Sequence, residues 1–178
     1  MIAHPQDILP AGRHRYTVRV YYEDTDAGGV VYHANYLRFA ERARTEALRV
    51  MGIPHAELVE RHGMMFMVRR AEVDYVRPAR PDDSLVIETE TLAVGGASLS
   101  LLQTVLGPEG PCAVLRIRLA CVRIAKREPG KRGCGDIKPG DIKPGRIPPR
   151  WRAVLGAMRD SGAAGRDSIG VEGSGSNG

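Results

Sequence analysis

An acidic loop directly before a helix carries the residues in this sequence that are best suited to chemistry. Asp24 and Asp26 follow a strand-like segment, and Gly28-Gly29 lets the backbone bend through positive φ. Asn35 is a favoured residue for capping the helix that follows. Because a helix start presents unpaired N–H groups and the positive end of a dipole, it could stabilise a carbonyl oxygen that gains negative charge while Asp26 attacks or accepts a proton. These residue types in this order are typical of a minimal acyl-transfer site.

Other interpretations of the same segment are weaker. A metal cluster of oxygen and imidazole ligands would consist of Glu23, Asp24, Asp26 and His33. No H-x-x-x-H or comparable fixed pair supports a transition metal, so the sequence predicts no metal and no cofactor. His33 could be a general base and Asp24 a loop cap, and we expect the backbone of His33 to matter more than its ring. Glu41 is expected to pair with Arg38, Arg44 or another side chain on its helix face.

Two runs of this region resemble a family signature. Residues 24–36 read D-T-D-A-G-G-V-V-Y-H-A-N-Y, and residues 41–46 read E-R-A-R-T-E. Both are similar to the signature of the Tol-Pal-associated acyl-CoA thioesterases, within the broader 4-hydroxybenzoyl-CoA thioesterase class. The likeness extends more loosely to about Ala125 and implies a hotdog fold, in which a long sheet wraps one central helix.

The resemblance also implies roles for particular residues. Asp26 matches the family's catalytic carboxylate, and the segment Val31, Tyr32 and His33 matches the loop whose backbone amides approach the thioester carbonyl. Two mechanisms stay open: Asp26 attacks the thioester to form a mixed anhydride, or it removes a proton from an attacking water.

The elements that must position this loop are a strand before it and a helix after it. His14 to Tyr22 alternates, with Tyr16, Val18, Val20 and Tyr22 on one face, as a half-buried strand would. From Asn35 apolar residues recur at three- and four-residue steps until Gly52, which predicts a helix of roughly sixteen residues and about 24 Å. Small residues on its apolar face, at positions 40, 43 and 47, would let a sheet approach closely.

The rest of the domain has the pattern of an antiparallel sheet. After a short helical link through Pro54 to Arg61, strand-like runs span Met64 to Val76, Ser84 to Val94, Ser98 to Leu106 and Cys112 to Ile124. Gly95-Gly96 and the turn from Gly107 to Gly110 are typical hairpin connections. The order predicts an α+β fold, which agrees with a hotdog domain.

Composition predicts one domain with extensions at both ends. We expect an N-terminal extension over 1–12, the hotdog domain over 13–126, a basic Pro/Gly-rich linker over 127–158 and a disordered Gly/Ser-rich tail over 159–178. In the linker the motif GDIKP occurs twice in succession, and we expect its prolines to block regular strand pairing. Ile147 to Met158 is predicted to form a short helix that docks through Trp151 and Leu155.

Charge and cysteine content limit the classes of binding partner and the cellular compartments that are expected for this protein. Residues 126–152 hold nine Lys or Arg against three acidic residues, and this segment could contact coenzyme A phosphates, although solvated chain is the more ordinary interpretation. Aromatic residues make up only 5% of the chain, which argues against nucleic-acid binding. Three cysteines without a C-x-x-C favour a reducing cytoplasm, and no segment is apolar enough for stable membrane insertion.

The sequence therefore predicts a cytoplasmic acyl-CoA thioesterase that releases a carboxylic acid and free coenzyme A. The resemblance implies a homodimer or homotetramer, and an acyl-carrier protein is a candidate second partner. The alternative is a non-catalytic module that holds an acyl-carrier protein, coenzyme A or an envelope-associated partner on the same fold. The sequence does not identify the acyl group.

Overall fold

A computed structural model describes residues 12–124 and 142–167, with side chains described as far as Arg159. Residues 1–11 of the predicted extension, residues 127–141 of the predicted linker and the last eleven residues lie outside these ranges.

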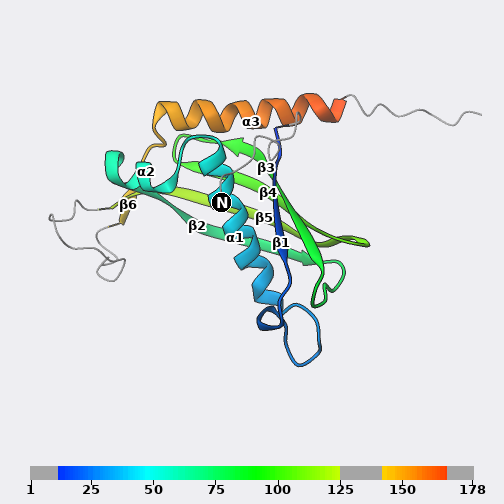
Figure 1. Cartoon of the computed structure of the whole chain (residues 1–178). Helices are drawn as coiled ribbons and strands as arrows, with labels where there is room; N and C mark the ends of the chain where they lie inside the picture. Colours follow the sequence, from blue (N-terminus) through cyan, green and yellow to red (C-terminus); the bar gives the residue numbers. More distant parts are fainter. Residues whose placement is uncertain (1–11, 125–141, 168–178) are drawn as a thin grey trace, which may run out of the picture.

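An antiparallel sheet forms the body of the molecule (Figure 1). Its strands lie in the order β1-β3-β4-β5-β2, and their bounds are β1 His14–Arg19, β3 Ser84–Val94, β4 Ser98–Gly107, β5 Gly110–Ile124 and β2 Met64–Tyr75. Glycine-containing turns join β3 to β4 and β4 to β5, as predicted, because neighbouring strands in the sequence pair as hairpins. A short strand, β6 Ile142–Pro144, pairs with the end of β5.

The sheet packs against one long helix, α1 His33–Val50, which crosses it in Figure 1. The buried side of α1 carries Phe39, Ala40 and Ala43, all with no exposed surface. Since alanine side chains are short, the strands can approach the helix axis closely, and a larger side chain would force the layers apart. The predicted α+β hotdog architecture is confirmed.

Two further helices cover the end of the domain that is distant from the start of α1. Helix α2 His55–His62 follows α1 after a short turn, and α3 Pro149–Asp167 packs chiefly against β3. Trp151 is fully buried and Leu155 is 2% exposed, so the predicted docking of this helix is confirmed. The Trp151 ring lies 6.1 Å from the ring of Phe66 on β2. Pro149 is well placed at the helix start, where a missing N–H leaves no bond unmade.

Several predicted boundaries were wrong for identifiable reasons. Tyr22 belongs to a short 3-10 turn, η2 Tyr22–Asp24, and is 82% exposed, so the alternation of β1 does not reach it. Strand β6 forms inside the predicted linker because Pro144 occupies its last position, and the next amide, that of Gly145, donates to Cys121 O at 3.0 Å. Helix α3 continues to Asp167, although disorder was predicted from Arg159. Once its first turns are docked, each added residue costs far less than nucleation did.

Among the described residues, no helix is long and apolar enough to cross a membrane.

Candidate active site

The acidic loop folds back on itself as a small hairpin. Thr25 and Val31 form an antiparallel bridge. On one side of this bridge Tyr32 N donates to Asp24 O at 2.9 Å, and on the other Asp26 N donates to Val30 O at 3.1 Å. Asp26 therefore begins the tight turn at the end of the hairpin.

The structure explains why glycine occupies both positions 28 and 29 of the turn. The Asp26 side chain is exposed, and its Oδ1 accepts a hydrogen bond from Gly28 N at 2.8 Å. A Cβ at Gly28 would lie only 3.0 Å from this oxygen, so a side chain there would crowd the carboxylate. Gly29 has φ of 70°, the left-handed conformation that glycine adopts without strain. The turn thus fixes one carboxylate oxygen and leaves the carboxylate open to solvent.

The amides of the predicted substrate loop are not equivalent. Val31 N donates to Ala79 O at 2.9 Å, and Tyr32 N is already bound to Asp24 O. No described group accepts a hydrogen bond from the amides of His33 and Ala34, the first two residues of α1. Because unpaired amides at a helix start carry the positive end of the dipole, His33 is the one predicted position whose amide can receive an oxyanion.

Asn35 does not cap α1, contrary to the prediction. The helix begins at His33, with Tyr32 in the capping position, so Asn35 lies within the first turn. The buried Asn35 side chain instead donates from Nδ2 to Asp24 O at 2.8 Å. It ties the base of the hairpin to the helix, because the same carbonyl already accepts the Tyr32 amide.

Two tyrosines that the sequence analysis did not single out hold the helix start. The Tyr75 hydroxyl donates to His33 O at 3.0 Å, and the His33 ring lies 4.3 Å from Tyr32 and 6.2 Å from Tyr75. Tyr36 Oη accepts from Ala79 N at 3.1 Å, and burial raises the pKa of this phenol. Tyr75 comes from β2, more than forty residues away in the sequence, and no local pattern marks that contact.

The remaining acidic residues have structural partners. Asp24 is 7% exposed, and its Oδ2 accepts from Tyr21 N at 2.9 Å, which confirms the predicted loop cap. Glu41 pairs with Arg44, one of its predicted partners. Within the described ranges, His, Cys, Asp and Glu side chains form no group of three that could hold a metal. The absence of a metal or cofactor stays a prediction.

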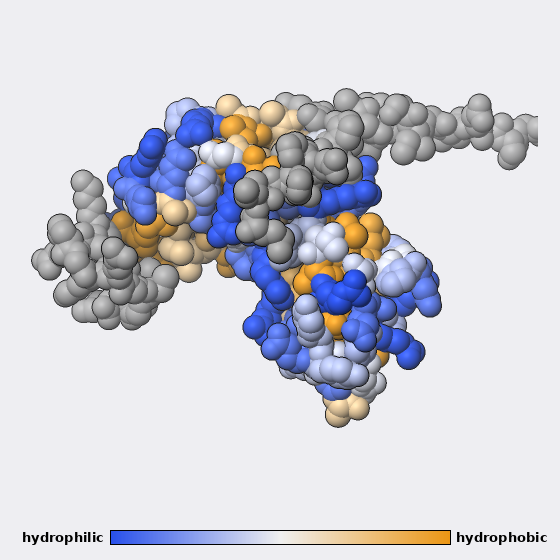
Figure 2. Space-filling view, viewed as in Figure 1, coloured by the Kyte–Doolittle hydropathy of each residue, from blue (hydrophilic) through white to orange (hydrophobic). Residues whose placement is uncertain are grey.

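A surface groove leads away from the loop along α1. This outer groove, of about 730 Å³, begins at Glu23 and Asp24 and continues between α1 and β2, where Val68 and Ala71 line it. Asp26 is not among its lining residues. Figure 2 shows mixed polar and apolar surface at the end of the molecule that carries the loop. A single chain therefore presents the carboxylate beside a groove and does not enclose it.

Comparison with known proteins agrees with this architecture. A family profile described as the Thioesterase-like superfamily matches residues 20–155. The acyl-CoA thioesterase YbgC of Haemophilus influenzae is 44% identical over 114 residues, which are 64% of this chain and 84% of that protein. The acyl-CoA thioester hydrolase YbgC of Escherichia coli O6:H1 is 45% identical over 116 residues, 65% of this chain and 86% of its own.

Solved structures show the same fold. A probable thioesterase from Bartonella henselae is similar with a TM-score of 0.62 at 33% identity, and the match covers 76% of this chain and 99% of that one. A thioesterase from Thermus thermophilus, complexed with coenzyme A and Zn, has a TM-score of 0.60 at 25% identity, with 82% and 94% covered. The match of sequence and fold confirms the resemblance stated above: this chain belongs to the thioesterase-like superfamily and has a hotdog fold.

Proposed function

We propose that the protein hydrolyses acyl-CoA thioesters, with Asp26 as the reacting carboxylate. The observation that carries the proposal is the hairpin, which offers an exposed carboxylate next to a helix start whose first two amides are unpaired. Relatives at 44% and 45% identity are named acyl-CoA thioesterase and acyl-CoA thioester hydrolase, which supports the same substrate class.

Two routes fit these groups. In the first, Asp26 attacks the thioester carbonyl carbon, the C–S bond breaks, and coenzyme A leaves as a thiolate that takes up a proton. Water then hydrolyses the mixed anhydride and restores the carboxylate. In the second, Asp26 accepts a proton from water as the oxygen adds to the carbonyl, and that proton ends on the leaving thiolate. In both routes the His33 amide would stabilise the carbonyl oxygen as it becomes negative.

A panel of acyl-CoA substrates tests the proposal directly. Release of free thiol would be followed for short and long aliphatic members and for an aromatic member such as benzoyl-CoA. We expect clear turnover of at least one member. Near-zero rates for every member would contradict an enzymatic function, and stoichiometric binding of an acyl-carrier protein without turnover would favour the non-catalytic alternative.

We also propose that the active unit is a homodimer or a homotetramer built from such dimers. Strand β2 pairs with β5 along one edge, and no described strand covers its other edge. Met67, Val68 and Tyr75 on this strand are 39%, 51% and 50% exposed. An open strand edge with exposed apolar side chains is typically covered in native proteins, and a second copy would also cover the groove beside Asp26.

We further propose a cytoplasmic location and an acyl-carrier protein as a second source of substrate. Cys112 and Cys121 are buried free thiols, and burial raises the pKa of both, so neither is activated for exchange. Cell fractionation with an antibody against the protein tests the location. Thiol release from an acylated carrier protein tests the partner.

A further inference from the structure

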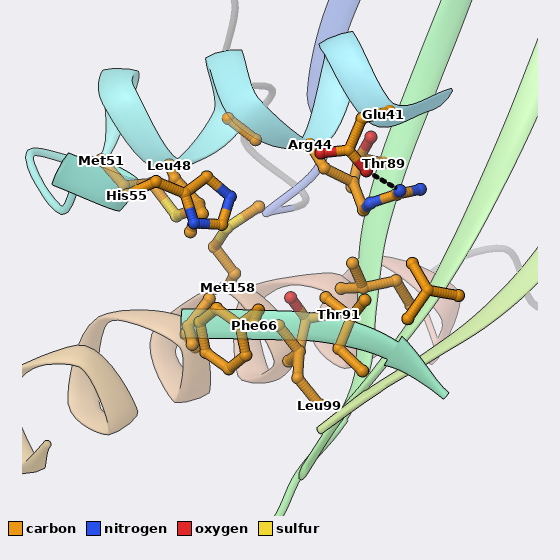
Figure 3. Close-up of a pocket in the computed structure, with 15 residues that line it drawn as sticks. Glu41, Arg44, Leu48, Met51, His55, Phe66, Thr89, Thr91, Leu99 and Met158 are labelled. Atoms are coloured by element: carbon orange, nitrogen blue, oxygen red, sulfur yellow. Dashed lines mark hydrogen bonds and ion pairs between the residues drawn. The ribbon is translucent and has the colours of Figure 1, made fainter. Parts of the chain in front are cut away.

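A partly open cavity lies deeper in the fold than the outer groove. This inner cavity, of about 50 Å³, lies between the second half of α1, the sheet and α3 (Figure 3). Apolar side chains from every surrounding layer line it, including Met51, Phe66, Leu99, Leu101, Leu155 and Met158. A cavity of this size has room for roughly three or four water-sized groups, such as the last few carbons of a hydrocarbon chain.

The inner cavity and the outer groove meet at shared residues. Glu41, Arg44 and Val68 line both spaces. The outer groove begins at Glu23 and Asp24 and follows α1, so the groove and the cavity lie in succession along the helix. The Glu41–Arg44 ion pair lies where the polar groove and the apolar interior meet.

This ion pair has one fixed and one movable member. The Arg44 side chain is 7% exposed, and its guanidinium donates to Gln103 Oε1 at 2.7 Å. Gln103 is fully buried and donates from Nε2 to Ala40 O at 3.0 Å and to Thr89 Oγ1 at 2.9 Å, which fixes its orientation. The Glu41 side chain is 56% exposed. Because a half-exposed ion pair is weak, Glu41 can swing toward solvent while Arg44 stays in place.

Beyond the ion pair, the cavity wall is suited to an uncharged ligand. His55 is the remaining titratable group in the lining, and burial lowers the pKa of its imidazole. Glu41, Arg44 and Arg49 act on the same ring, the carboxylate opposing the effect of the two arginines. The lowered pKa favours the neutral ring at pH 7, and the ring packs edge to face with that of Phe66, with ring centres 6.3 Å apart.

We propose that the inner cavity receives the distal end of a long acyl chain, with Leu155 and Met158 of α3 as the floor that limits its length. This inference rests on the proposed thioesterase function and adds the substrate class. From His33 to Glu41 the helix rises about 12 Å. A carbon chain advances roughly 1.3 Å per carbon, given a bond of about 1.5 Å, so about ten carbons span this distance. Shorter chains would end in the outer groove, and dodecanoyl or palmitoyl chains would enter the cavity.

The test is a change of cavity volume from α3, remote from the carboxylate. Met158→Trp would fill the cavity, and Ala157→Trp on the exposed side of the same helix is the matched control. We expect the ratio of kcat/KM for palmitoyl-CoA to that for butanoyl-CoA to fall by about tenfold or more in Met158→Trp, and to stay unchanged in the control. A ratio within about twofold of wild type in folded Met158→Trp overturns the inference.

Two further measurements keep the test decisive. If Met158→Trp shows no cooperative melting transition, Met158→Ala replaces it and should raise the ratio, and an unchanged ratio then counts against the cavity. If the wild-type protein hydrolyses no acyl-CoA, the proposed function fails separately. Binding of free palmitate, measured by calorimetry, then tests whether the inner cavity holds an acyl chain. Weaker binding by Met158→Trp than by Ala157→Trp supports this inference, and equal binding overturns it.

Discussion

At the scale of single residues, the proposed chemistry depends on the charge of Asp26. Asp26→Asn keeps the size of the side chain and the oxygen that accepts the Gly28 amide, so the hairpin should survive. Either mechanism needs the negative charge, so we expect turnover to fall about 100-fold or more, near 3 kcal/mol of barrier. Thiol release by protein with an unchanged circular dichroism spectrum measures this. Hydrolysis within a few fold of wild type would remove Asp26 from the mechanism, and a larger defect in His33→Ala would move it to the imidazole.

Turnover should depend on the position of the Asp26 carboxylate as well as on its charge. Gly28→Ala adds a Cβ at 3.0 Å from Asp26 Oδ1, so the carboxylate must shift from its position against the Gly28 amide. We expect kcat to fall by about tenfold, since small misplacements at a reacting group are costly. Gly96→Ala is the control, because nothing lies within 4 Å of an added Cβ there and its backbone is not in the left-handed region. Equal activity of the two variants would show that the turn tolerates a side chain.

At the scale of elements, burial of one aromatic ring should decide whether α3 docks. Trp151 has no exposed surface, and its ring packs beside Phe66. Trp151→Ala should lower the free energy of unfolding by about 3–5 kcal/mol, because it removes a large buried side chain and leaves a cavity. Urea unfolding measures the change, with the exposed neighbour Arg152→Ala as the control. A loss below about 1 kcal/mol would mean that α3 contributes little to the fold.

The elements themselves were largely predictable because their signals are local. Alternation found the five longer strands to within three residues at each end, and glycine turns found two hairpins. The capping position of α1 was misplaced by three residues because Asn35, a frequent cap, instead donates to Asp24 O across the loop. Strand β6 was missed because a three-residue pairing depends on its partner β5, not on its own sequence.

The candidate site was predictable only in part, for a similar reason. The family resemblance pointed to Asp26, Gly28 and Gly29, which lie together in one turn. It did not separate the unpaired amide of His33 from the two amides before it, because one of their acceptors, Ala79 O, is distant in the sequence. The contact of Tyr75 with His33 and the inner cavity likewise depend on how separate elements pack.

At the scale of the whole molecule, the half-buried imidazole of His55 links the free energy of unfolding to pH. Burial lowers its folded-state pKa below the ordinary value near 6.5, so the unfolded chain binds a proton first as the pH falls. The contribution of the neutral His55 ring to the free energy of unfolding is therefore complete above about pH 6.5. It is lost as the pH falls toward the folded-state pKa. We expect a lower melting temperature at pH 5.5 than at pH 7.5, and a smaller difference in His55→Leu. An equal difference in both proteins would exclude His55 as the source.

The exposed edge of β2 predicts that copies of the protein associate through this strand. Met67 is 39% exposed on this strand, and Leu92 on β3 is 36% exposed, so the two are matched in chemistry and exposure. If copies join along β2, Met67→Lys places two like charges in the interface and should convert dimers or tetramers to smaller species, whereas Leu92→Lys should not. Light scattering at micromolar concentration measures the mass.

Turnover should fall together with dissociation, because the groove beside Asp26 is open in a single chain. A wild-type monomer would refute the assembly, and dissociation by Leu92→Lys alone would place the interface on β3.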